Sequence, residues 1–149
     1  MQPIQFNDDF FMRIAISEAR DAFSSEEVPI GAVIVAGGSV VARAHNLVES
    51  LADSTAHAEM LVLTAAMNEL GSKYLTDCTL YVTLEPCIMC AGACAWAQIG
   101  RLVYGAPDPK RGFSLAGGSI LHPKTQVTSG ILSEECQHIM ASFFKNLRR

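Results

Sequence analysis

Three of the chain's five cysteines lie within eight residues, in the stretch PCIMCAGACAWAQIG from Pro86 to Gly100. Cys87 and Cys90 are three positions apart, so on a helix their side chains lie on one face. Cys87 directly follows Pro86, which favours the first helical turn, where unpaired N–H groups and the helix dipole favour a thiolate. Two thiolates on one turn can bind a single zinc ion. A redox pair and two core cysteines are the alternative interpretations of this spacing.

A second stretch whose residue types could bind a metal or take part in a reaction is TAHAEM, residues 55–60. On a regular helix His57 and Glu59 point about 200° apart, so both approach one ion only if it lies beyond the helix N-terminus. The polar loop ends at Thr55 and helical periodicity begins near Ala56, which places both residues at such an end. Ala56 lacks the oxygen that a capping box with Glu59 would need. A first-turn glutamate favoured by the dipole and a histidine at a helix start are the alternatives.

Two such helix ends can converge on one metal ion, with His57, Cys87 and Cys90 as its protein ligands. Cys94 lies about 10 Å along the helix axis from Cys87, too far for one ion with bonds of about 2.3 Å to gather all three sulfurs. A fourth position is therefore left for water, as in catalytic zinc sites. Zinc lowers the pKa of bound water toward about 7, and Glu59 is placed to transfer its proton. These parts suit hydrolytic removal of ammonia from an amino-substituted heterocycle.

The other cysteines and histidines are expected to have no ligand role. Five cysteines is an odd number, and a domain of this size needs no disulfides, so we expect reduced thiols in a cytosolic protein. We expect core packing for Cys78, Cys94 and Cys136, and no metal binding by His45, His122 and His138.

Composition predicts one domain over residues 1–149, since half of the residues are hydrophobic and 17% are charged. The N-terminus lacks the basic start and apolar stretch of a signal peptide, and no run approaches the roughly 18 apolar residues of a membrane span. We therefore expect a cytoplasmic location without membrane contact. The net charge of −4 argues against general polyanion binding. Candidates for a local basic path are Lys110-Arg111, Lys124 and residues 145–149.

Hydrophobic periodicity predicts alternating helices and strands. Helices are expected at 8–23, capped by Asn7 or Asp8, and at 57–70, 87–97 and 133–146. Strands are expected at 29–36, 39–44, 78–84 and 101–104, with a weaker one near 126–128. The glycine pair at 37–38 predicts a hairpin. The helix between the strands at 78 and 101 implies a crossover and a parallel pair, so the pattern describes an α/β sandwich.

The order His57-Ala58-Glu59 followed by Pro86-Cys87-Ile88-Met89-Cys90 is similar to the H-x-E…P-C-x-x-C signature of the zinc-dependent cytidine and deoxycytidylate deaminase family. Within that family the chain resembles the bacterial tRNA-specific adenosine deaminases over nearly its whole length. The segments that carry the resemblance are VPIGAVIV at 28–35, HN at 45–46, TAHAEM at 55–60, LYVTLEPCIMCAGA at 80–93, IGRLVYGAPDPKRG at 99–112 and the last helix at 130–149.

The resemblance implies a three-layer α/β/α cytidine-deaminase-like fold with a central mixed sheet of about five strands, and a homodimer. It implies conversion of adenosine to inosine at the wobble position of a tRNA anticodon, with one Zn²⁺ per subunit. The metal would be held by His57, Cys87 and Cys90, and Glu59 would shuttle the proton for a zinc-bound hydroxide.

The resemblance also implies contacts to the tRNA anticodon stem-loop. Asn46 would hydrogen-bond the flipped base, Val28 would line its pocket, and Asp108 and Lys110 would touch neighbouring nucleotides. A plain turn residue is the alternative interpretation of both Asn46 and Asp108. The stretch FSLAGGSILHPKT at 113–125 departs from the family pattern, so no contact beyond Lys110 is transferred.

Three other functions fit part of the pattern. A deaminase of a free base or nucleoside, of the cytosine or guanine type, would use the same chemistry in a closed pocket. A structural zinc module that binds RNA or protein would not need Glu59. A Cys-x-x-Cys oxidoreductase would keep a free dithiol without metal.

Overall fold

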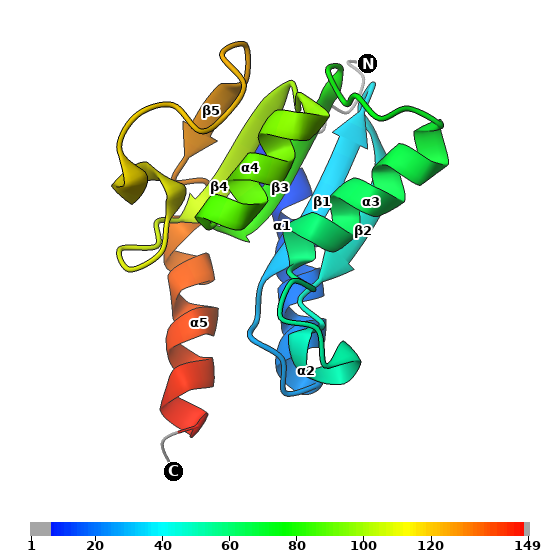
Figure 1. Ribbon diagram of the computed structural model, residues 1–149. Helices are drawn as coiled ribbons and strands as arrows, with labels where there is room; N and C mark the ends of the chain where they lie inside the picture. Colours follow the sequence, from blue (N-terminus) through cyan, green and yellow to red (C-terminus); the bar gives the residue numbers. More distant parts are fainter. Residues whose placement is uncertain (1–6, 148–149) are drawn as a thin grey trace, which may run out of the picture.

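A mixed sheet of five strands forms the centre of the computed structural model, which describes residues 7–147 (Figure 1). Its spatial order is β2-β1-β3-β4-β5. β1 pairs with β2 and β3 in antiparallel orientation, whereas β4 is parallel to β3 and β5. The strands are β1 Gly31–Ala36, β2 Ser39–His45, β3 Cys78–Leu84, β4 Arg101–Ala106 and β5 Gln126–Ser129.

The hairpin between β1 and β2 turns at Gly37 and Gly38, as the glycine pair predicts. Both residues have positive φ, 57° and 77°, a conformation that suits glycine and matches the twist of a two-residue hairpin. β1 is covered on both faces, because five of its six residues are buried. This burial explains why its sequence is a continuous apolar run and does not alternate with polar residues.

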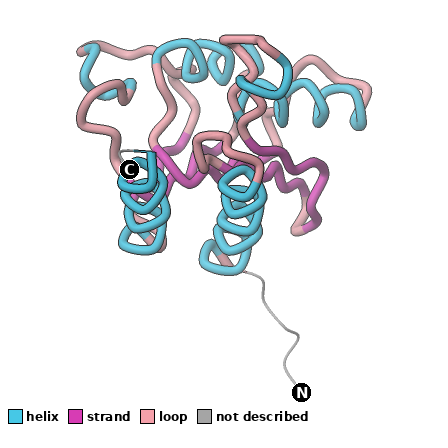
Figure 2. The backbone as a smooth tube through the Cα atoms, turned by 90° about the horizontal axis from the view of Figure 1, so that it is seen from below, coloured by secondary structure: helices cyan, strands magenta, loops and turns pink. Residues whose placement is uncertain are grey.

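Helices cover both faces of the sheet, which gives three layers (Figure 2). α1 (Asp8–Ser24) and α5 (Ser133–Leu147) pack on one face, and α3 (Ala58–Leu70) and α4 (Ile88–Ala97) pack on the other. Two short elements were not predicted: the helix α2 (Val48–Leu51) and the 3-10 turn η1 (Phe113–Ala116). The architecture confirms the three-layer fold and the parallel crossover through α4.

α1 begins where the sequence indicates, because the Oδ1 atom of Asn7 accepts a hydrogen bond from the N–H of Phe10 at 3.0 Å. The helix lies against β1 with almost no space between the two backbones. A Cβ atom on Gly31 would overlap the backbone of Ala15, so only glycine fits at this position of the strand. This close approach fixes how the first helical layer sits on the sheet.

Among the described residues, none of the helices has both the length and the apolar character that crossing a bilayer requires. α5 ends at Leu147, and Arg148 and Arg149 of the predicted basic path lie outside the described residues.

An ion pair between Asp8 and Arg101 connects the start of α1 to the sheet. Arg101 of β4 donates two hydrogen bonds to the carboxylate of Asp8, at 2.8 and 2.7 Å, and a third to Thr128 Oγ1 of β5 at 3.0 Å. The hydroxyl of Tyr81 in β3 donates to Asp8 Oδ1 at 2.8 Å. The hydrogen bond from Arg101 lowers the pKa of Asp8 below its ordinary value of 3.8, against the opposing effect of partial burial.

We expect Asp8→Asn to lower the free energy of unfolding by about 1–3 kcal/mol at neutral pH, because it removes a two-bond charged contact. The folded-state pKa of Asp8 is depressed, so its stabilisation is present above pH 3.8 and is lost as the pH falls through the folded pKa. Urea unfolding should therefore show the difference from wild type shrinking in acid. Asp9→Asn, an exposed neighbour in the same turn, should change stability by less than about 0.5 kcal/mol. Equal effects of the two variants would contradict this role.

Candidate metal centre

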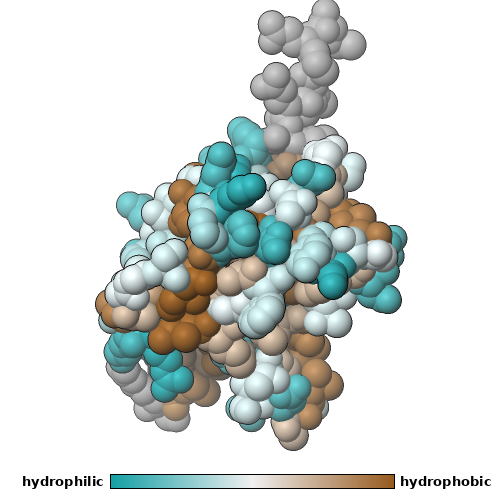
Figure 3. Space-filling view, turned by 45° about the horizontal axis from the view of Figure 1, so that its top comes forward, coloured by the Kyte–Doolittle hydropathy of each residue, from teal (hydrophilic) through white to brown (hydrophobic). Residues whose placement is uncertain are grey.

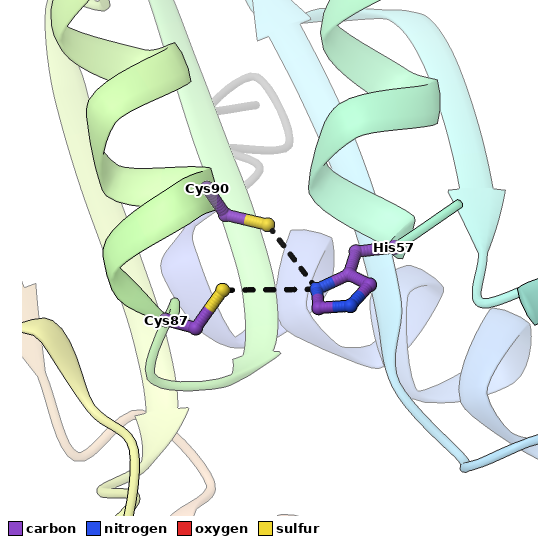
Figure 4. A group of neighbouring side chains, drawn as sticks. All are labelled: His57, Cys87 and Cys90. Carbon is purple, nitrogen blue, oxygen red and sulfur yellow. Dashed lines mark hydrogen bonds between the residues drawn. The ribbon is translucent and has the colours of Figure 1, made fainter. Parts of the chain in front are cut away.

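Two helix N-termini meet at the predicted metal site. His57 is the N-cap residue of α3, with φ −75° and ψ 152°, and Cys87 is the N-cap residue of α4, with φ −73° and ψ 175°. Neither side chain caps its own helix. The imidazole and the sulfur are instead directed toward one another, and Cys90 joins them from the first turn of α4 (Figure 4).

The distances between these three side chains suit a single metal ion. His57 Nδ1 lies 3.7 Å from the Cys87 sulfur and 3.5 Å from the Cys90 sulfur, and all three atoms lie within 4.8 Å of one another. Ligand bonds of about 2.3 Å to sulfur and about 2.0–2.1 Å to nitrogen at tetrahedral angles would place nitrogen and sulfur about 3.6 Å apart. The donor set therefore fits a tetrahedral ion with one position left over.

Glu59 lies in the first turn of α3, one residue after its start, and is only 3% exposed. Among the described residues, its Oε1 atom has no hydrogen-bond partner. Burial raises the pKa of Glu59 from 4.5 to about 7, and the negative charge of Cys87 adds to the rise, whereas His57 opposes it. A buried carboxyl group with one unpartnered oxygen, beside the three candidate ligand atoms, is suited to exchanging a proton.

The environment of Cys87 favours the deprotonated form that metals bind. A hydrogen bond from Cys90 lowers the pKa of Cys87 to about 5, and the N–H groups of Cys90 and Met89 add to this effect, whereas partial burial opposes it. These N–H groups belong to the open N-terminus of α4, as the position after Pro86 predicts.

Cys78, Cys94 and Cys136 are buried, as predicted, and none of them belongs to this donor group. His45 belongs to a second group of donor atoms, with Glu18 and Asp21. The Glu18 carboxylate there contacts Arg43 Nε at 2.9 Å and His45 Nδ1 at 3.0 Å. These contacts form a polar network between α1 and β2, and the absence of metal binding by His45 stays a prediction.

Asn46 and Val28 lie on the His57 side of the centre. Asn46 is 5% exposed, and its N–H donates to Ile30 O at 3.2 Å, so its segment runs beside the one that follows Val28. The N–H of Leu47 donates to Ala56 O at 3.0 Å. This bond closes the loop and brings Asn46 near the start of α3.

Glu27 is a functional candidate that the sequence interpretation missed. Its fully buried carboxylate accepts hydrogen bonds from the N–H of Glu49 at 2.9 Å, the N–H of Ser50 at 2.7 Å and the Ser50 hydroxyl at 2.6 Å. Burial raises its pKa, but these bonds outweigh burial and leave the pKa below 4.5. Because Val28 follows Glu27 and Asn46 shortly precedes α2, one carboxylate holds both predicted base-binding segments.

Asp108 and Lys110 lie on the Cys87 side of the centre. The loop that carries them contacts α4 through a backbone bridge between Gly112 and Cys87. Asp108 Oδ1 accepts hydrogen bonds from the N–H groups of Lys110 at 3.0 Å and Arg111 at 3.1 Å, so part of its role is to hold this turn. The Lys110 side chain is exposed. Sequence reasoning missed Glu85, a buried carboxylate that also binds this loop.

A groove of about 700 Å³ between α1 and α5 has none of the predicted site residues in its lining. It lies in the helical layer opposite to α3 and α4. The predicted chemistry is thus confined to the ends of α3 and α4 and to the loops on either side of them.

Comparisons with known proteins agree with the fold and identify the family of the chain. A family model described as MafB19-like deaminase matches residues 6–148, so the chain is a deaminase. A tRNA-specific adenosine deaminase of Bacillus subtilis (strain 168) is 47% identical over 147 residues, which cover 95% of this chain and 91% of that protein. The chain belongs to the family of tRNA-specific adenosine deaminases.

Two solved structures are also similar. One, from a study of A-to-I editing by tRNA:A34 deaminases at the wobble position of transfer RNA, has a TM-score of 0.80 at 45% identity and covers 87% of this chain and 97% of its own. A guanine deaminase from Bacillus subtilis has a TM-score of 0.67 at 30% identity, with 95% of each chain covered.

Metal analysis of the purified chain tests the donor group directly. We expect about one metal ion per chain, and its loss in Cys87→Ala, because the remaining two donors bind far more weakly. Cys94→Ala, about one turn beyond Cys90 along α4, should keep the metal. Retention of the metal by Cys87→Ala, or its loss in Cys94→Ala, would contradict the assignment.

Proposed function

We propose that this chain deaminates adenosine to inosine at the wobble position of a tRNA anticodon, with a zinc ion held by His57, Cys87 and Cys90. The observation that carries the proposal is the convergence of these three donor atoms beside the buried carboxyl group of Glu59. Two sulfurs and one imidazole favour zinc among the divalent metals. The family membership supports the reaction and the substrate.

When bound, zinc supplies a Lewis acid that lowers the pKa of water at the site. Glu59 then performs the proton transfers of the reaction. Its carboxylate accepts a proton from the attacking water and passes it to the ring nitrogen next to the amino-bearing carbon. The water oxygen bonds to that carbon, and Glu59 carries the second water proton from this oxygen to the amino group. The carbon–nitrogen bond then breaks, which leaves a carbonyl group on the ring and releases ammonia. Burial of Glu59 favours this role, because it brings the pKa close to neutral.

The loops on the two sides of the centre supply the substrate contacts that we propose. Asn46 binds the edge of the flipped base and Val28 packs against it. On the other side, Lys110 meets the phosphates or bases next to the target nucleotide, and Asp108 orders the turn that presents it. Recognition of unstacked loop bases needs only a local basic group, which is compatible with the net charge of −4. A tRNA substrate is consistent with a cytoplasmic enzyme.

The second candidate is deamination of a free base, and the likeness to a guanine deaminase favours it in part. Its sequence identity is 30%, against 45% for the tRNA:A34 deaminase structure and 47% for the curated relative. The exposed Lys110 also suits a nucleic acid better than a small neutral base.

Glu59→Gln should abolish deamination and keep zinc, because the amide matches the size of the carboxyl group but cannot carry the proton. We expect a fall in rate of at least about 10²-fold, as for other positioned proton-transfer groups. The assay is inosine formation in unmodified tRNA with adenosine at the wobble position, with free adenosine, cytidine and guanine run alongside. Normal turnover by the variant would reject the role of Glu59, and turnover of guanine alone would favour the second candidate.

We also propose a homodimer, and α4 offers a surface for it. Trp96 is 85% exposed, more than any other large hydrophobic side chain among the described residues, and Ile88 on the same helix is 56% exposed. Hydrophobic side chains gather in a band on the surface of the molecule (Figure 3). A second copy of this chain would cover Ile88 and Trp96 on α4.

Light scattering during size-exclusion chromatography tests the dimer. We expect twice the chain mass of 16.0 kDa for the wild type and the single mass for Trp96→Glu, because a buried unpaired charge opposes association. A wild-type monomer at micromolar concentration would contradict the proposal. Leu70→Glu, at the exposed end of α3, provides a control that should remain dimeric.

A further inference from the structure

Glu85 is a buried carboxylate whose position links the metal site to the 108–114 loop. It follows the last residue of β3, precedes Pro86 and is 4% exposed. Its Oε1 atom accepts the N–H of Asp108 at 3.0 Å, and its Oε2 atom accepts the N–H of Ser114 at 3.0 Å. One rigidly placed side chain therefore holds both ends of this loop.

The glycine at position 112 shows how closely the loop wraps around this carboxylate. A Cβ atom on Gly112 would overlap the carboxyl group of Glu85. The backbone of Gly112 has φ −62° and ψ 145°, a conformation open to every residue, so conformational freedom does not explain the glycine. The space taken by Glu85 does explain it.

Backbone contacts also connect the 108–114 loop to the start of α4. The N–H of Phe113 donates to Pro86 O at 2.9 Å, and Gly112 forms a bridge with Cys87. Inside the loop, the N–H of Gly112 donates to Asp108 O at 3.0 Å. The 108–114 loop is thus fixed at its ends by Glu85 and at its middle by its own turn, which leaves the exposed side chains of Lys110 and Arg111 on its outer side.

We propose that Glu85 is a positioning residue, which holds the 108–114 loop in the conformation that binds the nucleotides next to the target adenosine. This inference rests on the proposed function. A loop without this anchor would have to be ordered when the RNA binds, and the conformational entropy lost in ordering would weaken binding. Proton transfer depends on Glu59, which lies in α3 and belongs neither to this loop nor to its anchor. Loss of the anchor should therefore raise KM and leave kcat nearly unchanged.

The test compares wild type with Glu85→Gln on an anticodon stem-loop that contains the wobble adenosine. Glutamine keeps the size of the side chain but turns an NH₂ donor toward a backbone N–H, so one of the two bonds is lost. We expect KM to rise about tenfold, kcat to stay within about twofold, and zinc content to be unchanged. Glu69→Gln, which removes the same charge from the exposed surface of α3, should keep both constants within about twofold of wild type.

Gly112→Ala tests the same anchor from the loop side, because its methyl group would push the loop away from Glu85. It should raise KM in the same way, and it decides the question if Glu85→Gln does not fold. An unchanged KM with a lower kcat would indicate only a smaller folded fraction and would overturn the proposal. Loss of zinc in the variants would also overturn it. A wild-type protein that leaves the stem-loop unmodified would refute the proposed function itself and not the anchor alone.

Discussion

The N-termini of α3 and α4 have to meet for the proposed metal site to form, because each helix begins directly after one of its donor residues, His57 or Cys87. Successive residues on a helix are rotated by about 100°, so a shift of either helix start by one residue would turn its ligand away. The two helices are kept in place by packing into one core cluster on the same face of the sheet. Small residues allow this close packing, and those of the two helices that are buried in the cluster are Ala58, Ala66, Cys94 and Ala97. The chemistry of the site is therefore a consequence of how two helix ends are packed.

Two buried carboxylates extend this rigidity to the loops around the centre. Glu27 immediately precedes the segment leading to β1 and binds the start of α2, whereas Glu85 follows β3 and binds the 108–114 loop. Burying a carboxylate is unfavourable unless its oxygens are hydrogen-bonded, and loop N–H groups need an acceptor when strands cannot provide one. The loop N–H groups donate to the carboxylate oxygens, so both requirements are satisfied by the same hydrogen bonds. The N–H of Glu27 donates to Ala22 O of α1, and Glu85 directly follows β3, so a helix and a strand place the two carboxylates. The carboxylates in turn fix loops that have no extended secondary structure of their own.

How much of the fold and of the candidate site could be predicted depends on how far apart in the sequence the interacting residues lie. The helices, the strands and the hairpin come from local periodicity and from glycine or proline signals, and their predicted bounds lie within two residues of the structure. The donor group was predictable because helix geometry alone restricts where His57 and Cys87 can point. The partners of Glu27 and Glu85 lie 22 to 29 positions away, and no local pattern marks them. For the same reason α2 and η1 were missed, because each is a short turn held by a distant carboxylate.

The net charge of −4 does not describe the charge near the site, because several of the acidic side chains are buried or paired. Glu27, Glu59 and Glu85 are buried, and each occupies a defined position at the centre or beneath a loop. Asp8 is paired with Arg101, and Glu18 contacts Arg43. Charges that are buried or paired contribute less to the potential at the surface than the same number of exposed carboxylates would. The loop beside Cys87, in contrast, exposes two consecutive cationic side chains, Lys110 and Arg111. The sign of the charge near the site is thus set by a few exposed residues, which is why a chain with a net charge of −4 can still meet a polyanion at one loop.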